Sequence, residues 1–193
     1  AEILKGEGYQ THLCGKLHLW PKRKLFGFCS ADWADSPKDR GDRDDYQRFL
    51  VNQGITLPGA SSAHGVDLNS YIARPYHLEE RFHFSNWVTD RAIDFLERKD
   101  PTAPYFLNVS YFHPHHPLTP PTPYYERYLN SELPQPVESE WSHQYDLPPH
   151  GKSVNAWRVK LPKEVQRQMT AAYYGCINHI DDQIGRILQK VNG

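Results

Sequence analysis

Three histidines stand close together between prolines in the segment PYFLNVSYFHPHHPLTPP, residues 104–121. They are His113, His115 and His116, and they follow directly on an apolar run. Imidazole changes its protonation state near neutral pH, so such a cluster suits proton transfer, contact with an anion or metal binding. The prolines in and after the cluster restrict the backbone that carries it. We therefore expect chemistry at this segment.

A second candidate pair lies near the start of the chain, where Lys16 and His18 occur in the stretch GKLHL. A cation and an imidazole two residues apart in one loop can both face an oxyanion and stabilise its charge. A single lysine or histidine is more often a surface or packing residue, so this pair depends on its surroundings for support.

Two predicted strands position these side chains. Residues 105–112 are mostly aliphatic or aromatic with little alternation, which is typical of a strand buried on both faces of a parallel sheet. Residues 9–14 predict a shorter strand. In open α/β sheets, catalytic groups gather beyond the carboxyl ends of the strands. We therefore expect Lys16, His18 and His115 to converge at one edge of one sheet.

A predicted helix precedes the apolar strand. Residues 85–99 begin with Ser85 as the expected N-cap, and they carry an apolar stripe made of Val88, Ala92, Phe95 and Leu96. The order helix then strand favours a wound α/β sheet with flanking helices. Residues 20–75 and 118–161 are irregular and rich in charged residues or proline, which predicts long surface loops.

The chain closes with a long predicted helix that begins with Pro162 in its first turn and runs towards Val191. Unbroken, it would be about 45 Å long at about 1.5 Å per residue. Its apolar stripe is expected to contain Val165, Met169, Ala172, Cys176, Ile180, Ile184 and Leu188.

Composition narrows the classes of function. The chain has 193 residues, which suits one core rather than two large domains. Its 22 basic and 23 acidic residues give a net charge of −1, so we expect no nucleic-acid partner. Every apolar run falls short of the roughly 20 residues that a membrane span needs, so we expect no membrane span. The 3 cysteines show no C-x-x-C spacing, and their odd number allows at most one disulfide.

Three blocks of the sequence resemble the sulfatase family. GYQTHLCGKLHLW, residues 8–20, is similar to the family's GKWHLG signature, with leucine in place of tryptophan at position 17 and Trp20 where glycine is common. The strand followed by PHHPLTPP matches a second family block, and YYGCINHIDDQIGRIL, residues 173–188, is similar to its long helix. The blocks occur in the family's order.

The resemblance implies an α/β fold of the alkaline-phosphatase-like class and a set of residue roles. The family's signature lysine and histidine contact the sulfate oxygens and the formylglycine nucleophile, which implies catalytic roles for Lys16 and His18. Alignment on the proline implies the same for His115. His113 and His116 are then neighbours that line the substrate cleft.

The family's nucleophile and metal ligands do not occur in these residues. No cysteine or serine lies in the C-x-P-x-R or S-x-P-x-R context that matures to formylglycine, and the family's calcium-binding Asp motifs are absent, so no metal ligand is assigned. We therefore interpret residues 1–193 as a partial domain, the central part of a sulfatase catalytic domain whose calcium ligands lie outside this chain. The resemblance implies a small-molecule or carbohydrate sulfate ester as substrate, and it favours a periplasmic, secreted or lysosomal location.

Three other interpretations remain open. A phosphonate or phosphodiester monoester hydrolase of the same superfamily would use similar motifs. His113 and His115 also form an H-x-H pair at a strand end, as in zinc amidohydrolases, although further ligands after later strands are not evident. A non-catalytic binding scaffold is the third, because the nucleophile is missing.

Overall fold

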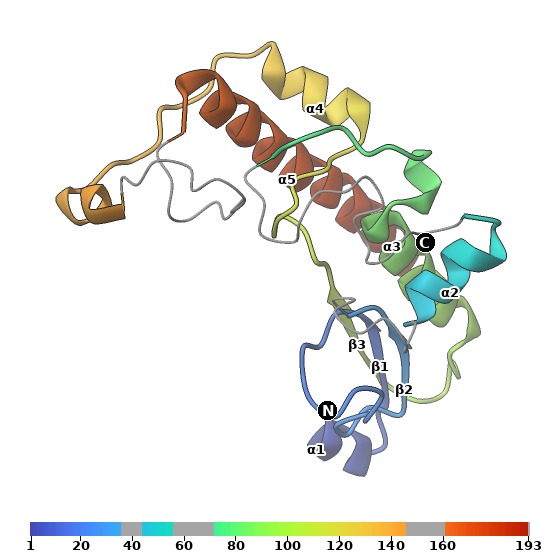
Figure 1. Cartoon of the computed structure of the whole chain (residues 1–193). Coiled ribbons are helices and arrows are strands. Elements are labelled where there is room, and N and C mark those ends of the chain that lie inside the picture. The colour runs from blue at the N-terminus through green and yellow to red at the C-terminus, as the bar shows by residue number, and fades with distance from the viewer. Residues whose placement is uncertain (36–43, 56–71, 146–160, 193) are drawn as a thin grey trace. The chain divides into compact units, whose positions relative to one another are not determined.

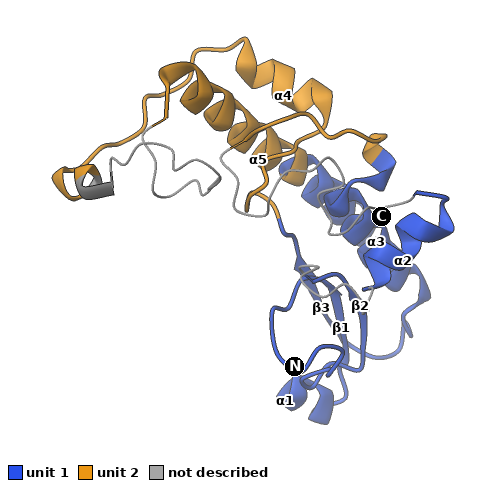
Figure 2. Ribbon diagram, viewed as in Figure 1, with its two compact units in different colours: residues 1–63, 81–112, 181–193 blue, residues 64–80, 113–180 orange. Residues whose placement is uncertain are grey.

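The computed structural model describes residues 1–35, 44–55, 72–145 and 161–192. The described residues form two compact units (Figure 2): residues 1–63, 81–112 and 181–193 belong to the first, and residues 64–80 and 113–180 to the second. The elements, labelled in Figure 1, are α1 (Glu2–Gly6), β1 (Gln10–Gly15), β2 (Ser30–Trp33), α2 (Asp45–Asn52), α3 (Phe84–Arg98), β3 (Tyr105–Ser110), α4 (Thr122–Leu129) and α5 (Lys163–Asn192), with short 3-10 turns at Glu80–Phe82 and Glu140–Tyr145.

The first unit is built on a parallel sheet with the strand order β2-β1-β3. β1 lies in the centre, and its residues from Thr11 to Gly15 are buried. Successive side chains of a strand point to opposite faces. On one face the His12 ring stacks on Phe95 of α3, with centroids 4.5 Å apart. Leu13 belongs to a separate core cluster with Phe28 and Trp33.

The strand predicted at 9–14 is confirmed as β1, but the expectation for β3 was wrong in two respects. β3 ends at Ser110 instead of reaching residue 112, and all its residues are half-buried instead of fully buried. The reason is its position: β3 pairs only with β1 among the described strands, so it forms the edge of the described sheet. A mostly apolar run with little alternation therefore did not mean burial on both faces.

The region 20–75 was expected to be an irregular loop, yet its described part contains β2 and α2. α2 begins with a capping box, in which Asp44 Oδ1 accepts from Gln47 N at 2.8 Å and Gln47 Oε1 accepts from Asp44 N at 3.3 Å. The region 118–161 likewise contains α4, which has a proline in its first turn. Residues 36–43, 56–71 and 146–160 of these two expected loops lie outside the described residues.

Helix α3 confirms the helix expected at 85–99, although its N-cap is His83 and not Ser85. The His83 ring nitrogen Nδ1 accepts from the backbone N–H of Ser85 at 3.1 Å. Ser85 itself lies inside the first turn and is buried. A histidine ring has therefore taken the acceptor role that a serine hydroxyl usually plays.

In the second unit, α4 runs along the first part of α5 (Figure 2) and closes a small apolar core. Gly175 lets the chains approach, because a Cβ there would lie 3.1 Å from both Pro120 Cγ and the carbonyl oxygen of Tyr124. The core consists of Leu118, Tyr125, Ala171, Ala172 and Cys176.

The buried face of α5 differs from the predicted stripe after Cys176. The polar side chains of His179 and Gln183 are buried, whereas Ile184 and Leu188 are 41% and 54% exposed. His179 meets Glu80, with Nε2 and Oε1 3.3 Å apart, so this polar residue has a partner in the interior. Among the described helices, none has the length and apolar character that crossing a bilayer requires.

Candidate active site

The backbone at the end of β1 places Lys16 in the first unit. Gly15 has φ +101°, and a Cβ at this position would lie 2.0 Å from the carbonyl oxygen of Ser110 in β3. Only glycine fits there without displacing backbone. The next residue continues the contact, since Lys16 N donates to Ser110 O at 3.1 Å. Lys16 is thereby tied to the end of the neighbouring parallel strand.

The side chain of Lys16 lies over an aromatic ring. Its Nζ is 4.6 Å from the centroid of Phe112, and the lysine is half-buried. A cation over a ring face is attracted by the ring's quadrupole. Phe112 directly precedes His113 in the chain, so the ammonium group lies where the histidine segment begins. The Phe112 ring and the backbone hydrogen bond to Ser110 together restrict the position of the Lys16 ammonium group.

His18 and Leu17 follow Lys16 and take different environments. Leu17 packs against the core cluster of Leu13, Phe28 and Trp33, so it acts as an anchor for the loop. His18 is exposed and has φ 54°, in the left-handed region. This sparsely populated backbone conformation is often found at functional sites.

In the second unit, the histidine segment forms a turn at His113–His116. His115 is exposed, and its Nδ1 lies 2.7 Å from the carbonyl oxygen of His116. A carbonyl can only accept, so Nδ1 carries a hydrogen. The ring is thus oriented by its own loop.

His113 has a different environment from His115. It is half-buried, and Thr119 Oγ1 lies 3.5 Å from its Nε2. Burial, together with the nearby charge of His179 and a smaller effect of His115, lowers the pKa of His113 to about 3. His113 is therefore neutral at ordinary pH, which suits a positioning or hydrogen-bonding role better than that of a proton donor.

The buried histidine His179 of α5 was missed in the sequence, where the helix was interpreted from its apolar residues alone. It is fully buried, its Nε2 lies 3.3 Å from Glu80 Oε1, and its ring centroid lies 4.9 Å from that of Tyr124. Its spacing of three residues from Cys176 places it on the helix face that is buried, a signal that the sequence did contain.

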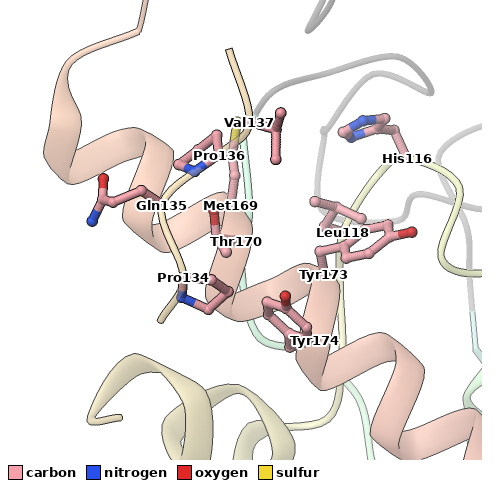
Figure 3. A pocket seen from close by; sticks show the side chains of 10 residues that line it. All are labelled: His116, Leu118, Pro134, Gln135, Pro136, Val137, Met169, Thr170, Tyr173 and Tyr174. Carbon is pink, nitrogen blue, oxygen red and sulfur yellow. The ribbon is translucent and has the colours of Figure 1, made fainter. Parts of the chain in front are cut away.

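A pocket of about 460 Å³ opens beside His116 in the second unit (Figure 3). Its walls come from the histidine segment, from residues 134–137 and from the first half of α5. Apolar and aromatic side chains dominate, with a few polar groups, which is typical of pockets for small molecules. The lining residues are His116, Leu118, Pro134, Gln135, Pro136, Val137, Met169, Thr170, Tyr173 and Tyr174.

The structure therefore groups the predicted site residues by unit. Lys16 and His18 lie in one loop of the first unit, and His113, His115 and His116 lie in one turn of the second. Each group follows the carboxyl end of a strand, β1 or β3, and these strands are parallel neighbours. The convergence of Lys16, His18 and His115 on one anion stays a prediction.

The chain is similar to known proteins along its whole length. The profile of the sulfatase family matches residues 1–193. An arylsulfatase of Clostridium perfringens is 37% identical over 194 residues, which cover 94% of this chain and 40% of that protein. The uncharacterized sulfatase YidJ of Escherichia coli is 30% identical over 200 residues, covering 97% of this chain and 36% of that one. The chain thus spans about 40% of the length of the first of these curated relatives.

A solved structure supports the fold. The phosphonate monoester hydrolase of Agrobacterium radiobacter superposes with a TM-score of 0.66 and 21% identity, covering 99% of this chain and 43% of the other. This likeness confirms the alkaline-phosphatase-like α/β fold as a partial domain. The family profile, which matches every residue of the chain, confirms the resemblance first noted in the three sequence blocks. The chain belongs to the sulfatase family.

Proposed function

We propose that the complete protein hydrolyses sulfate esters and that residues 1–193 are the central part of its catalytic domain. Lys16, His18 and His115 contact the sulfate group, and His113 and His116 line the substrate cleft. The observation that carries the proposal is the position of the Lys16 ammonium, 4.6 Å from the ring of Phe112 at the start of the histidine segment, in a chain of the sulfatase family.

Lys16 supplies a fixed positive charge. Cleavage of a sulfate ester moves negative charge onto the sulfate oxygens and the leaving oxygen. A cation held in position before the reaction stabilises this charge without reorganisation. Lys16 is held by its backbone bond to Ser110 and by the Phe112 ring, and it is half-buried, so water screens it less than an exposed lysine.

His115 supplies a hydrogen-bond donor. Its Nδ1–H is engaged with the carbonyl of His116 at 2.7 Å, so Nε2 is the atom that meets the sulfate. When protonated, Nε2–H donates to a sulfate oxygen or to the leaving oxygen. His115 is exposed, unlike the half-buried, neutral His113, which supports giving this role to His115.

The organic part of the ester occupies the pocket beside His116. A volume of about 460 Å³ is enough for an aromatic ring or a sugar unit. Tyr173 and Tyr174 line the pocket and offer flat faces and hydroxyl groups, which suit either kind of ring. The substrate class is therefore a small-molecule or carbohydrate sulfate ester.

We further propose that the nucleophile is a formylglycine and that the metal is calcium, both held by residues outside this chain. Calcium prefers oxygen ligands. Among the described residues, one group of three metal-ligating side chains is close enough to share an ion, and it contains the imidazole of His12 and the thiol of Cys14. That set does not suit calcium, so no step of the reaction is assigned to a metal here.

A phosphonate monoester hydrolase is the second candidate, favoured by the fold likeness to the Agrobacterium enzyme. Steady-state kinetics of the complete protein on an aryl sulfate and the matched aryl phosphonate ester separate the two. We expect kcat/KM for the sulfate to be at least about tenfold higher, which corresponds to about 1.4 kcal/mol in the barrier. A preference for the phosphonate would establish the second candidate, and turnover of neither ester would reject both.

A further inference from the structure

Three side chains with metal-binding atoms meet in the interior of the first unit. His12 and Cys14 are two residues apart on β1, so they point to the same face of the sheet. Asp32 of β2 is the ladder partner of Cys14 and points to that face as well. The ligand atoms of the three residues all lie within 4.8 Å of one another.

The distance between the His12 and Asp32 ligand atoms fits a tetrahedral ion. His12 Nε2 and Asp32 Oδ2 are 3.1 Å apart. Two ligands at about 2.0–2.1 Å from a tetrahedral zinc ion are separated by about 3.3 Å. The Cys14 sulfur lies within 4.8 Å of both atoms, so it must move closer to form a zinc–sulfur bond of about 2.3 Å. A set of one nitrogen, one sulfur and one carboxylate oxygen suits zinc, whereas calcium and magnesium prefer sites made of oxygen ligands alone.

The histidine is already held as a ligand would be. Its Nδ1 lies 2.7 Å from Ser30 Oγ, and its ring lies flat on Phe95, with an interplanar angle of 2°. A metal-bound histidine characteristically donates its other ring N–H to a neighbouring acceptor, which orients the ring and selects the tautomer. Ser30 takes that place here, so that Nε2 faces Asp32.

We propose that His12, Cys14 and Asp32 bind one zinc ion, with a water molecule as fourth ligand, at a site separate from the sulfate-ester chemistry. His12 and Cys14 are 6% and 0% exposed, whereas the Asp32 side chain is 28% exposed and gives the ion its access to solvent. On binding, the Cys14 thiol releases its proton to solvent and the thiolate joins the metal. The charges of thiolate and carboxylate then balance the dication.

The ion would cross-link the two strands. β1 carries two of the ligands and β2 the third, and β1 ends at Gly15, directly before Lys16. A bond through the metal therefore stabilises the strand that delivers the proposed catalytic lysine. Without the ion, the same residues form a histidine–carboxylate pair beside a neutral thiol, which is the alternative that the experiment must exclude.

The test uses the complete protein, freed of metal by a chelator and supplied with calcium to fill any calcium site. Cobalt(II) is titrated as the spectroscopic probe, since a cobalt–thiolate bond gives a near-ultraviolet charge-transfer band that oxygen-only sites lack. We expect one equivalent of cobalt to produce this band and zinc to remove it. The melting temperature should also rise with zinc and fall again with the chelator.

Three variants assign the ligands. Cys14→Ser should abolish the band, and Asp32→Asn should weaken cobalt binding by at least about tenfold. Cys29→Ser is the matched control: Cys29 precedes β2 directly and is exposed, and its replacement should leave the band unchanged.

Circular dichroism checks the fold of each variant. The nearly isosteric Asp32→Asn keeps the test decisive if Cys14→Ser does not fold. No band in the native protein, a band that survives Cys14→Ser, or undiminished binding by Asp32→Asn would overturn the proposal.

Discussion

The ammonium nitrogen of Lys16 lies 4.6 Å from the centroid of the Phe112 ring, and these two residues come from loops that follow neighbouring parallel strands. The contact joins the end of β1 to Phe112, the residue that precedes the histidine segment in the chain, within the first unit. It positions a charge without neutralising it, because a ring face attracts a cation but does not accept its proton. A site that binds an anion needs a cation that is held in position and keeps its charge.

Removal of the Lys16 charge should impair catalysis and leave the fold intact. Lys16→Met keeps an unbranched chain on Phe112 but loses the ammonium group, so kcat/KM on an aryl sulfate should fall by roughly 10²–10³. Lys24→Met is the matched control, because Lys24 also lies over a ring, with Nζ 5.2 Å from the Phe26 centroid, but is exposed. Steady-state kinetics of the complete protein, with thermal melts, provide the measurement. Equal losses of kcat/KM in the two variants would contradict the proposed contact between Lys16 and the sulfate.

Among the three clustered histidines, His115 should matter most for turnover. His115→Ala removes the proposed donor to the sulfate and should lower kcat/KM by roughly 10²-fold, or about 2.7 kcal/mol. His116→Ala should act mainly on KM, because His116 lines the pocket. His113→Ala should act partly through stability, because its ring is half-buried. A larger catalytic loss in a well-folded His113 variant would transfer the role to His113.

Gly15 should be far less tolerant of a methyl group than Gly8, although both have positive φ, +101° and +83°. At Gly8 a Cβ would meet nothing within 4 Å, so Gly8→Ala costs only the left-handed backbone term, about 1–2 kcal/mol. At Gly15 the same atom would lie 2.0 Å from Ser110 O, which adds about 1–3 kcal/mol of overpacking. Urea unfolding of the two variants measures the difference. Equal destabilisation would contradict the close approach of β1 and β3.

His113 should make the protein less stable as the pH falls. Its pKa is lowered from 6.5 to about 3 in the folded state, mainly by burial. Between these values the unfolded chain takes up a proton that the folded state does not, so the free energy of unfolding decreases on acidification from about pH 6.5. Unfolding curves of the native protein and of His113→Gln, measured between pH 6.5 and 4, should converge because the variant lacks this loss. Parallel curves would show that His113 titrates normally.

Local patterns were sufficient for the elements that carry the site. The loose alternation at 9–14, the stripe of α3 and the long periodic run of α5 predicted those elements, because each pattern depends on neighbours in the chain. The GKLHL and PHHP motifs likewise led to the family. α2 was missed although the sequence contains its capping residues, Asp44 and Gln47, at the spacing of a capping box. β2 was missed because a strand of four residues is too short to show a clear period.

The amino-acid sequence alone determined the family, the parallel α/β class and the candidate residues Lys16, His18 and His115, since these rest on local spacing. Only the tertiary structure decided which side chains are buried and what they meet. His179 lies inside because Glu80, about 100 positions away, gives it a partner, and β3 is half-exposed because it lies at the edge of the described sheet. The ligand group of His12, Cys14 and Asp32 likewise exists only because β2 pairs in register beside β1. Partners so far apart in the chain leave no periodic signal in it, because burial of a polar group depends on the residue that folding brings beside it.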